Sequence, residues 1–148
     1  MEIAIIAHEN KKELMAQLCI AYSHILSKHC LCAMANVGRY VEEATGLKIE
    51  KMLIGDYGSG EQQMASRISY NEIDCLLYFR DTSSSRAVTQ ISGNNLDEDA
   101  LNILRLCDLH NVPVATNIAT AELLICAVER GDLDWRNYVN PMYNKNVE

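Results

Sequence analysis

The stretch Ile54-Gly55-Asp56-Tyr57-Gly58-Ser59-Gly60-Glu61-Gln62-Gln63 is a glycine-rich loop between an apolar, strand-like run and an amphipathic helix. Glycine permits positive φ angles and lets the backbone approach a ligand closely. Glu61 stands where the helix begins, facing whatever occupies the loop. Because a plain turn needs neither three glycines nor an acid, this stretch predicts a ligand site at the edge of a sheet.

On both sides of the loop, short apolar runs alternate with segments in which apolar residues recur at helical spacing. Strands are expected at residues 2–7, 30–35, 49–54, 75–79 and 112–116. Helices are expected at residues 11–26, from a turn at 36–38 to Gly46, and at 61–70, 98–109 and 120–129. Residues 81–97 read as a loop at the active edge or a lid, with Asp97 capping the next helix and Leu101, Leu104 and Cys107 as its apolar stripe.

Strands separated by helices of this length form β-α-β units, which build a parallel sheet with helices on both faces. The 148 residues are enough for one domain with a core of its own. We therefore expect a single three-layer α/β/α domain over residues 1–148, with about five parallel strands. The tail at 132–148 is expected to pack on it through Trp135, the only tryptophan.

Composition excludes several classes of function. A net charge of −7 argues against general attraction to nucleic acid or to an anionic membrane. No apolar run reaches the roughly 18 residues of a membrane helix, and the start lacks the basic region of a signal peptide, so a cytoplasmic protein is expected. Six cysteines show no metal-ligand spacing with the histidines, which favours buried reduced thiols over a metal site. An anionic ligand would need a local trap of backbone amides or a specific lysine.

In a parallel sheet, ligands bind at the carboxyl ends of the strands. Polar and glycine residues gather at all five predicted ends, which are 8–9, 35–38, 55–61, 80–81 and 116–117. Each has a plainer reading as well. His8 could simply donate a hydrogen bond to a loop carbonyl, and Lys12 could be an ordinary surface lysine. Asp81 could only start a turn, and Asn117 could only cap the last helix. The residues alone indicate a small-ligand pocket of undetermined chemistry.

A family resemblance extends over nearly the whole chain. It is carried by Ile-Ala-His8-Glu, Glu-Ala-Thr-Gly-Leu47, Gly-Glu-Gln-Gln63, Ile-Ser-Tyr-Asn-Glu-Ile-Asp74, Tyr-Phe-Arg-Asp81 and Val-Pro-Val-Ala-Thr-Asn117. This order resembles methylglyoxal synthase. The resemblance implies a hexamer that converts dihydroxyacetone phosphate to methylglyoxal and phosphate without metal or cofactor. It also implies that a carboxylate removes a proton beside the carbonyl and that the enediolate expels phosphate.

The family's pattern implies roles for individual residues. It assigns catalytic roles to Glu61, in place of the family's aspartate, and to Asp99, Asp81 and His8. It assigns substrate binding to Lys12, Asn36, Val37, Gly38 and Gly55.

The chain departs from the pattern at the phosphate site. The family's Ala-Thr-Gly-Thr-Thr-Gly is Ala33-Met34-Ala35-Asn36-Val37-Gly38 here, so three hydroxyls are missing. Their loss corresponds to about 4–9 kcal/mol of charge-assisted hydrogen bonding. Ile54 replaces a serine, and the loop is one residue longer. The histidine of the family's Pro-His-x-Pro-Asp motif, a different residue from His8, and its C-terminal arginine have no counterpart.

Three functions follow from these differences. The first is a synthase of weak or lost activity. The second is a non-catalytic module that binds a small phosphorylated metabolite, and the third is an inactive subunit that joins an active paralogue.

Overall fold

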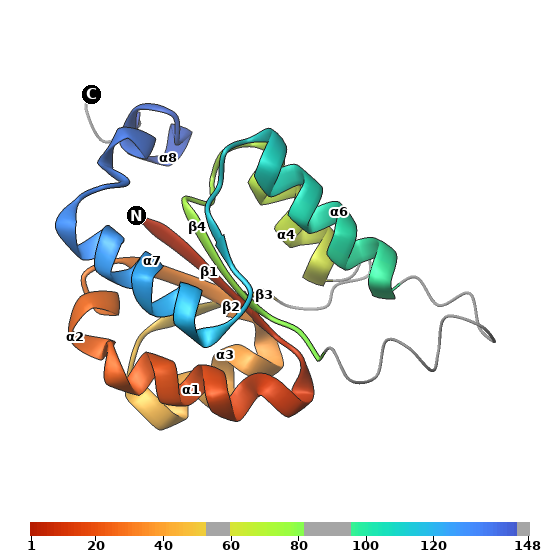
Figure 1. The fold of residues 1–148 in the computed structure, drawn as a ribbon, viewed down its shortest axis with the longest axis vertical. Coiled ribbons are helices and arrows are strands. Elements are labelled where there is room, and N and C mark those ends of the chain that lie inside the picture. The colour runs from red at the N-terminus through yellow and green to blue at the C-terminus, as the bar shows by residue number, and fades with distance from the viewer. Residues whose placement is uncertain (53–59, 82–95, 145–148) are drawn as a thin grey trace.

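The computed structural model describes residues 1–52, 60–81 and 96–144, without the side chains of 96–99 and 144 (Figure 1). Its core is a parallel sheet of five strands in the order β3-β2-β1-β4-β5. The strands are β1 Glu2–Ala7, β2 Cys30–Met34, β3 Ile49–Met52, β4 Cys75–Phe79 and β5 Val114–Ala115. The α/β class predicted from the sequence is confirmed. Of the loop predicted over residues 81–97, residues 82–95 lie outside the described residues.

Helices cover both faces of the sheet, with α1, α3 and α7 on one side and α4 and α6 on the other (Figure 1). The α-helices are α1 Lys12–Ala21, α2 Ser23–Leu26, α3 Ala35–Thr45, α4 Gly60–Ser69, α6 Leu96–Leu109, α7 Ile118–Arg130 and α8 Pro141–Asn144. The short 3-10 helices are η1 Glu9–Lys11 and η2 Asp134–Tyr138. No helix in these ranges is long and apolar enough to cross a membrane.

The central strand β1 is apolar throughout because it is covered on both faces. Ile3 and Ile5 pack with α1, α3 and α7, whereas Ala4 and Ile6 pack with α4 and α6. Alternate side chains of a strand point to opposite faces, so a continuous apolar run is what this position requires.

Helix ends were predicted best where the residue type determines the backbone. Gly46 and Gly131 have φ angles of +73° and +80° and end α3 and α7. Both lie in the left-handed region that glycine enters without strain. The predicted cap of α7 is confirmed, because Asn117 Oδ1 accepts the Thr120 N–H at 3.0 Å.

Other helix boundaries were predicted wrongly. The helix expected over 11–26 is divided at Tyr22, whose φ of −111° and ψ of 21° are not helical. Residues 36–38 belong to the first turns of α3 rather than to a turn before it. Helix α6 begins at Leu96, so Asp97 is not its cap.

The buried face of α6 was predicted only in part: Cys107 is buried as expected, whereas Leu104 is half-buried and Leu101 is exposed. Ala100, Ile103 and Cys107 face the sheet, and they follow each other at helical spacing. Leu101, one position out of phase with them, is 61% exposed.

A buried ionic network joins the C-terminal segment to the sheet. Arg136 Nε donates to Asp74 Oδ1 at 3.2 Å, and both side chains are fully buried. The Arg136 guanidinium also donates to the carbonyls of Ile73, His110 and Asn111 at 3.0–3.1 Å. Trp135, expected to pack on the domain, is 46% exposed.

Asp74 receives further hydrogen bonds. It accepts from Asn140 Nδ2 at 3.1 Å and from the Glu2 N–H, at the start of β1, at 2.8 Å. The network therefore holds η2 and the residues after it against the amino ends of β1 and β4.

Removing one partner of the buried pair should be costly. Arg136→Met leaves the Asp74 carboxylate buried without its cation, and we expect the free energy of unfolding in urea to fall by about 3–5 kcal/mol. Arg130→Met is the control, because Arg130 and Asp132 form an exposed pair at 2.8 Å, and it should cost less than about 1 kcal/mol. Equal losses in the two variants would contradict the structural role of the Asp74–Arg136 pair.

Burial should protect most of the cysteines from alkylation. All six thiols are free, and burial raises the pKa values of Cys19, Cys75 and Cys107 to about 12. Because the thiolate is the nucleophile, only about one in ten thousand of these three thiols is in the reactive form at pH 8. Iodoacetamide should modify exposed Cys30 in the folded protein, but Cys19, Cys75 and Cys107 only after unfolding, as peptide mass spectrometry would show. Rapid native labelling of Cys75 would show that the sheet is less closely packed.

Candidate functional site

A pocket of about 550 Å³ lies at the carboxyl edge of the sheet, where the sequence predicted a ligand site. Its apolar lining is Ile6, Ala7, Met34, Ala35 and Met52. Gly60 and the polar residues His8, Asn36, Arg39 and Glu61 complete it. The ends of β1, β2 and β3 and the starts of α3 and α4 thus contribute to one cavity. Of the nine candidate residues named from the sequence, three line this pocket.

His8 is held by the neighbouring strand. Its N–H donates to the Phe79 carbonyl at 3.0 Å, and its Nδ1 accepts the Asp81 N–H at 2.9 Å. The ring also meets Tyr78 edge-on, with 6.2 Å between centroids. Because Nδ1 is an acceptor, the neutral ring carries its proton at Nε2. This tautomer gives His8 a hydrogen-bond donor for a ligand.

Glu61 lies in the first turn of α4 and lines the same pocket as His8. A helix N-terminus favours a negative charge, so this position suits an ionised carboxylate. The preceding residue, Gly60, is buried against Met34, whose sulfur would lie 2.2 Å from any Cβ added there. The Met34 side chain therefore reaches the start of α4 and packs against Gly60, the residue next to Glu61.

The predicted phosphate turn is the beginning of α3, and its residues face different directions. Asn36 is exposed and lines the pocket. Val37 is buried in the core, 1% exposed, and a Cβ on Gly38 would lie 3.1 Å from Lys51 Cγ. Neither Val37 nor Gly38 lines the cavity. Any contact of Val37 or Gly38 with a ligand would have to use backbone atoms.

Neither Lys12 nor Asp81 lines the cavity, and both make contacts elsewhere. Lys12 Nζ donates to Glu9 and lies 5.1 Å from the centre of the Tyr40 ring. The bond to Glu9 raises the pKa of the Lys12 ammonium. Asp81 supplies the N–H that fixes His8, so it acts on the pocket through its backbone.

The two remaining predicted residues cannot be placed at the pocket. Gly55 lies outside the described residues, and Asp99 belongs to α6 without a described side chain. Their roles stay predictions based on the resemblance.

Arg39 lines the pocket and was not predicted. It follows Asn36 by three positions on α3, so the two side chains share a helix face. That spacing was the signal that could have found it. A basic residue one turn after a strand's carboxyl end is otherwise easily taken for a surface residue.

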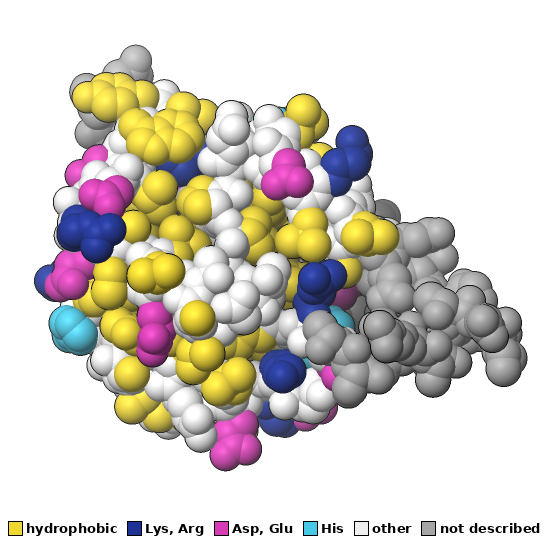
Figure 2. Space-filling view, in the orientation of Figure 1, with side chains coloured by type: hydrophobic (Ala, Val, Ile, Leu, Met, Phe, Trp, Pro, Cys, Tyr) yellow, Lys and Arg dark blue, Asp and Glu magenta, His cyan; other side chains and the backbone are white. Residues whose placement is uncertain are grey.

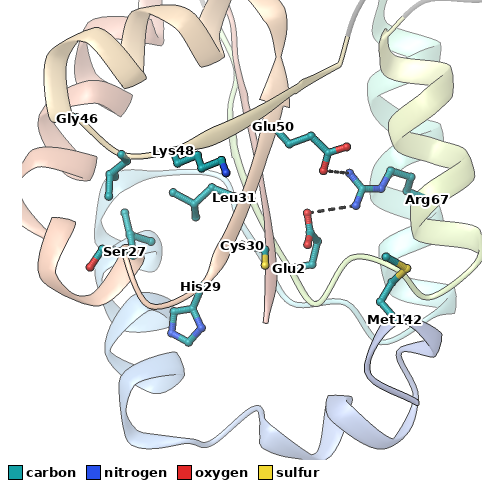
Figure 3. A pocket seen from close by; sticks show the side chains of 12 residues that line it. Glu2, Ser27, His29, Cys30, Leu31, Gly46, Lys48, Glu50, Arg67 and Met142 are labelled. Atoms are coloured by element: carbon teal, nitrogen blue, oxygen red, sulfur yellow. Dashed lines mark hydrogen bonds and ion pairs between the residues drawn. The ribbon is translucent and has the colours of Figure 1, made fainter. Parts of the chain in front are cut away.

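A second pocket of about 570 Å³ lies at the opposite, amino edge of the sheet. There Arg67 binds Glu2 at 3.2 Å and Glu50 at 3.7 Å, and Figure 3 shows both carboxylates directed at its guanidinium. Burial raises the pKa of the Glu2 carboxyl, while Arg67 opposes that shift. Arg67 is therefore neutralised by carboxylates that line the same pocket.

No metal centre is found in the described part of the chain, where no three His, Cys, Asp or Glu side chains are grouped to hold an ion. The chemistry available at the carboxyl edge is that of a carboxylate, an imidazole, an amide and a guanidinium in a largely apolar pocket.

Comparison with known proteins identifies the family, although no family model matches the chain. The chain is 51% identical over 146 residues to the methylglyoxal synthase of Caldicellulosiruptor saccharolyticus, covering 99% of this chain and 97% of that protein. It is 43% identical over 136 residues to that of Thermoanaerobacter sp., covering 92% and 96%. The crystal structure of methylglyoxal synthase from Elizabethkingia anophelis NUHP1 superposes with a TM-score of 0.69 at 29% identity, over 84% of this chain and 76% of that one. The chain therefore belongs to the methylglyoxal synthase family.

Proposed function

We propose that the protein converts dihydroxyacetone phosphate to methylglyoxal and phosphate in the pocket at the carboxyl edge, with a turnover that is weak for the family. The observation that carries the proposal is that Glu61 and His8 line one cavity. The relatives named methylglyoxal synthase supply the reaction that these two groups could perform.

The chemistry requires a base and an oxyanion donor. Glu61 removes a proton from the carbon beside the carbonyl, and the Nε2–H of His8 donates to the oxygen on which negative charge develops. The resulting enediolate breaks the carbon–oxygen bond to phosphate, which leaves with that electron pair. The enol left behind becomes methylglyoxal by taking up a proton at its terminal carbon and losing the proton of its hydroxyl group. Asp99 and Asp81 stay candidates for further catalytic roles by resemblance.

The weakness of the reaction follows from the altered residues around the substrate. Met34, Asn36 and Val37 offer no hydroxyl to a phosphate, and Met34 extends to Gly60 beside the base. A glutamate is also longer than the family's aspartate. A displacement of about 1 Å in a catalytic base can cost on the order of 100-fold in rate.

A non-catalytic role in binding a small phosphorylated metabolite is the second candidate. The observation that favours it is the apolar character of the lining, to which Ile6, Met34 and Met52 contribute. Such a pocket suits binding of a ligand with an apolar part as well as an anionic one. The third possibility, an inactive subunit beside an active paralogue, also stays a prediction.

Turnover separates the two candidates. At high protein concentration, dihydroxyacetone phosphate should yield methylglyoxal and phosphate in equal amounts above an enzyme-free blank. Glu61→Gln should lower the rate at least about 100-fold, because an amide cannot accept the proton. Glu50→Gln is the matched control, since Glu50 lies at the opposite edge, and it should leave the rate unchanged. Absence of product from the unaltered protein, or full activity of Glu61→Gln, would overturn the proposal.

We also propose a homo-oligomer, a hexamer by resemblance to the family. Figure 2 shows hydrophobic side chains spread over the face of the molecule that carries α7. Exposed apolar residues on α7 and η2 include Ile118, Leu123, Trp135 and Tyr138. Exposure of this many large apolar side chains is typical of surfaces that bind protein.

Light scattering during size-exclusion chromatography tests the assembly. We expect a mass six times that of the 16.6 kDa chain. Leu123→Glu, which places a charge on the exposed face of α7, should lower that mass if the face is buried between subunits. A single-chain mass for the unaltered protein would contradict the hexamer.

A further inference from the structure

Arg39 is the single Lys or Arg among the described residues that line the carboxyl-edge pocket. It lies on α3, three positions after Asn36, and its side chain is exposed. Among the described residues it takes part in no ion pair, whereas Arg67 in the other pocket has three carboxylate partners. Arg39 can therefore bind an anion without first giving up a carboxylate of the protein.

The net negative charge of the whole chain means that an anionic ligand depends on a local cation such as Arg39. The protein carries a net charge of −7, so an anionic metabolite is not attracted by the surface in general. It needs a local cation within a cavity. At the carboxyl edge that cation shares a pocket with Glu61, whose negative charge would otherwise repel the ligand.

Nearby side chains in the described part of the chain provide few alternatives for binding an anion. Residues 34, 35 and 37 are Met, Ala and Val, and Lys12, a predicted substrate-binding residue, is engaged by Glu9. Asn36 adds an amide N–H donor on the same helix face as Arg39. A guanidinium presents two parallel N–H groups that match two oxygens of a phosphate.

We propose that Arg39, assisted by Asn36, is the anion-binding residue of this pocket and makes it specific for small phosphate monoesters. The inference rests on the proposed function for its location beside Glu61, but phosphate binding by Arg39 requires no turnover. The ester's phosphate lies on Arg39 and Asn36, and its carbon part enters the apolar region formed by Met34 and Met52. Arg39 is thus a specificity-determining residue rather than a participant in proton transfer.

Binding of inorganic phosphate, measured by isothermal titration calorimetry, tests the assignment separately from catalysis. Arg39→Gln should raise the Kd for phosphate by about 10- to 100-fold, the loss expected for charge-assisted hydrogen bonds. Arg39→Lys should raise it less, because the charge is kept but the paired donors are not. Higher ionic strength should weaken binding to the unaltered protein more than binding to Arg39→Gln.

Controls distinguish binding from folding and one pocket from the other. Arg, Gln and Lys have similar helix propensities, and Arg39 is exposed, so urea midpoints should be unchanged in both variants. Lys48→Gln removes a cation from the opposite pocket and should leave the Kd for phosphate unchanged.

Three outcomes would overturn the assignment: no phosphate binding by the unaltered protein, an unchanged Kd in Arg39→Gln, or an equal loss in Lys48→Gln. If Arg39→Gln loses phosphate binding while the unaltered protein releases no methylglyoxal, the proposed reaction fails and the Arg39 site stands. If the unaltered protein and Arg39→Gln both convert dihydroxyacetone phosphate and have the same Kd for phosphate, the reaction stands and the Arg39 site fails.

Discussion

The parallel pairing of β1 with β4 is the constraint on which the candidate site depends. Ala7 lies opposite Phe79 in the register, so the next residue, His8, donates its N–H to Phe79 and accepts the N–H of Asp81 on Nδ1. A one-residue shift would turn every side chain of β1 to the other face and remove both contacts. At the amino end, Asp74 holds the same two strands through the Glu2 N–H and the buried Arg136.

The two edges of the sheet differ in how their charges are compensated. At the amino edge Arg67 is surrounded by carboxylates, and at the carboxyl edge Arg39 and Glu61 line a mostly apolar cavity. An arginine with several carboxylate partners stabilises the fold but has little capacity left for a ligand. The edge at which ligands bind in parallel sheets is therefore also the edge whose arginine has no carboxylate partner among the described residues.

The sequence was most informative where residue type determines structure directly. Apolar runs located the strands, Gly46 and Gly131 located helix ends, and the chain's motifs located the family. The pocket itself could be predicted because its residues follow strand ends. Helix phase was harder: Leu101 and Ile103 are equally apolar, and only packing against the sheet decides which one is buried.

The least predictable features were long-range polar contacts. Arg136 lies 62 positions from Asp74, and nothing in a local pattern distinguishes a buried arginine from an exposed one. Arg39 was missed for a related reason, since its relation to His8 and Glu61 exists only after β1, β2 and α4 are assembled. The loss of hydroxyls at residues 34–37 could be read from the sequence, but not the cation beside them.

Both proposals require that a small phosphate compound binds at the carboxyl edge of the sheet. Phosphate titrated into the ¹⁵N-labelled protein tests this binding most directly, by the backbone amide shifts of assigned residues. We expect the largest changes at His8, Asn36, Arg39 and Glu61, and none at Ser27, His29 and Lys48 in the opposite pocket. Shifts concentrated around Lys48 and Arg67, with the carboxyl edge unchanged, would contradict it.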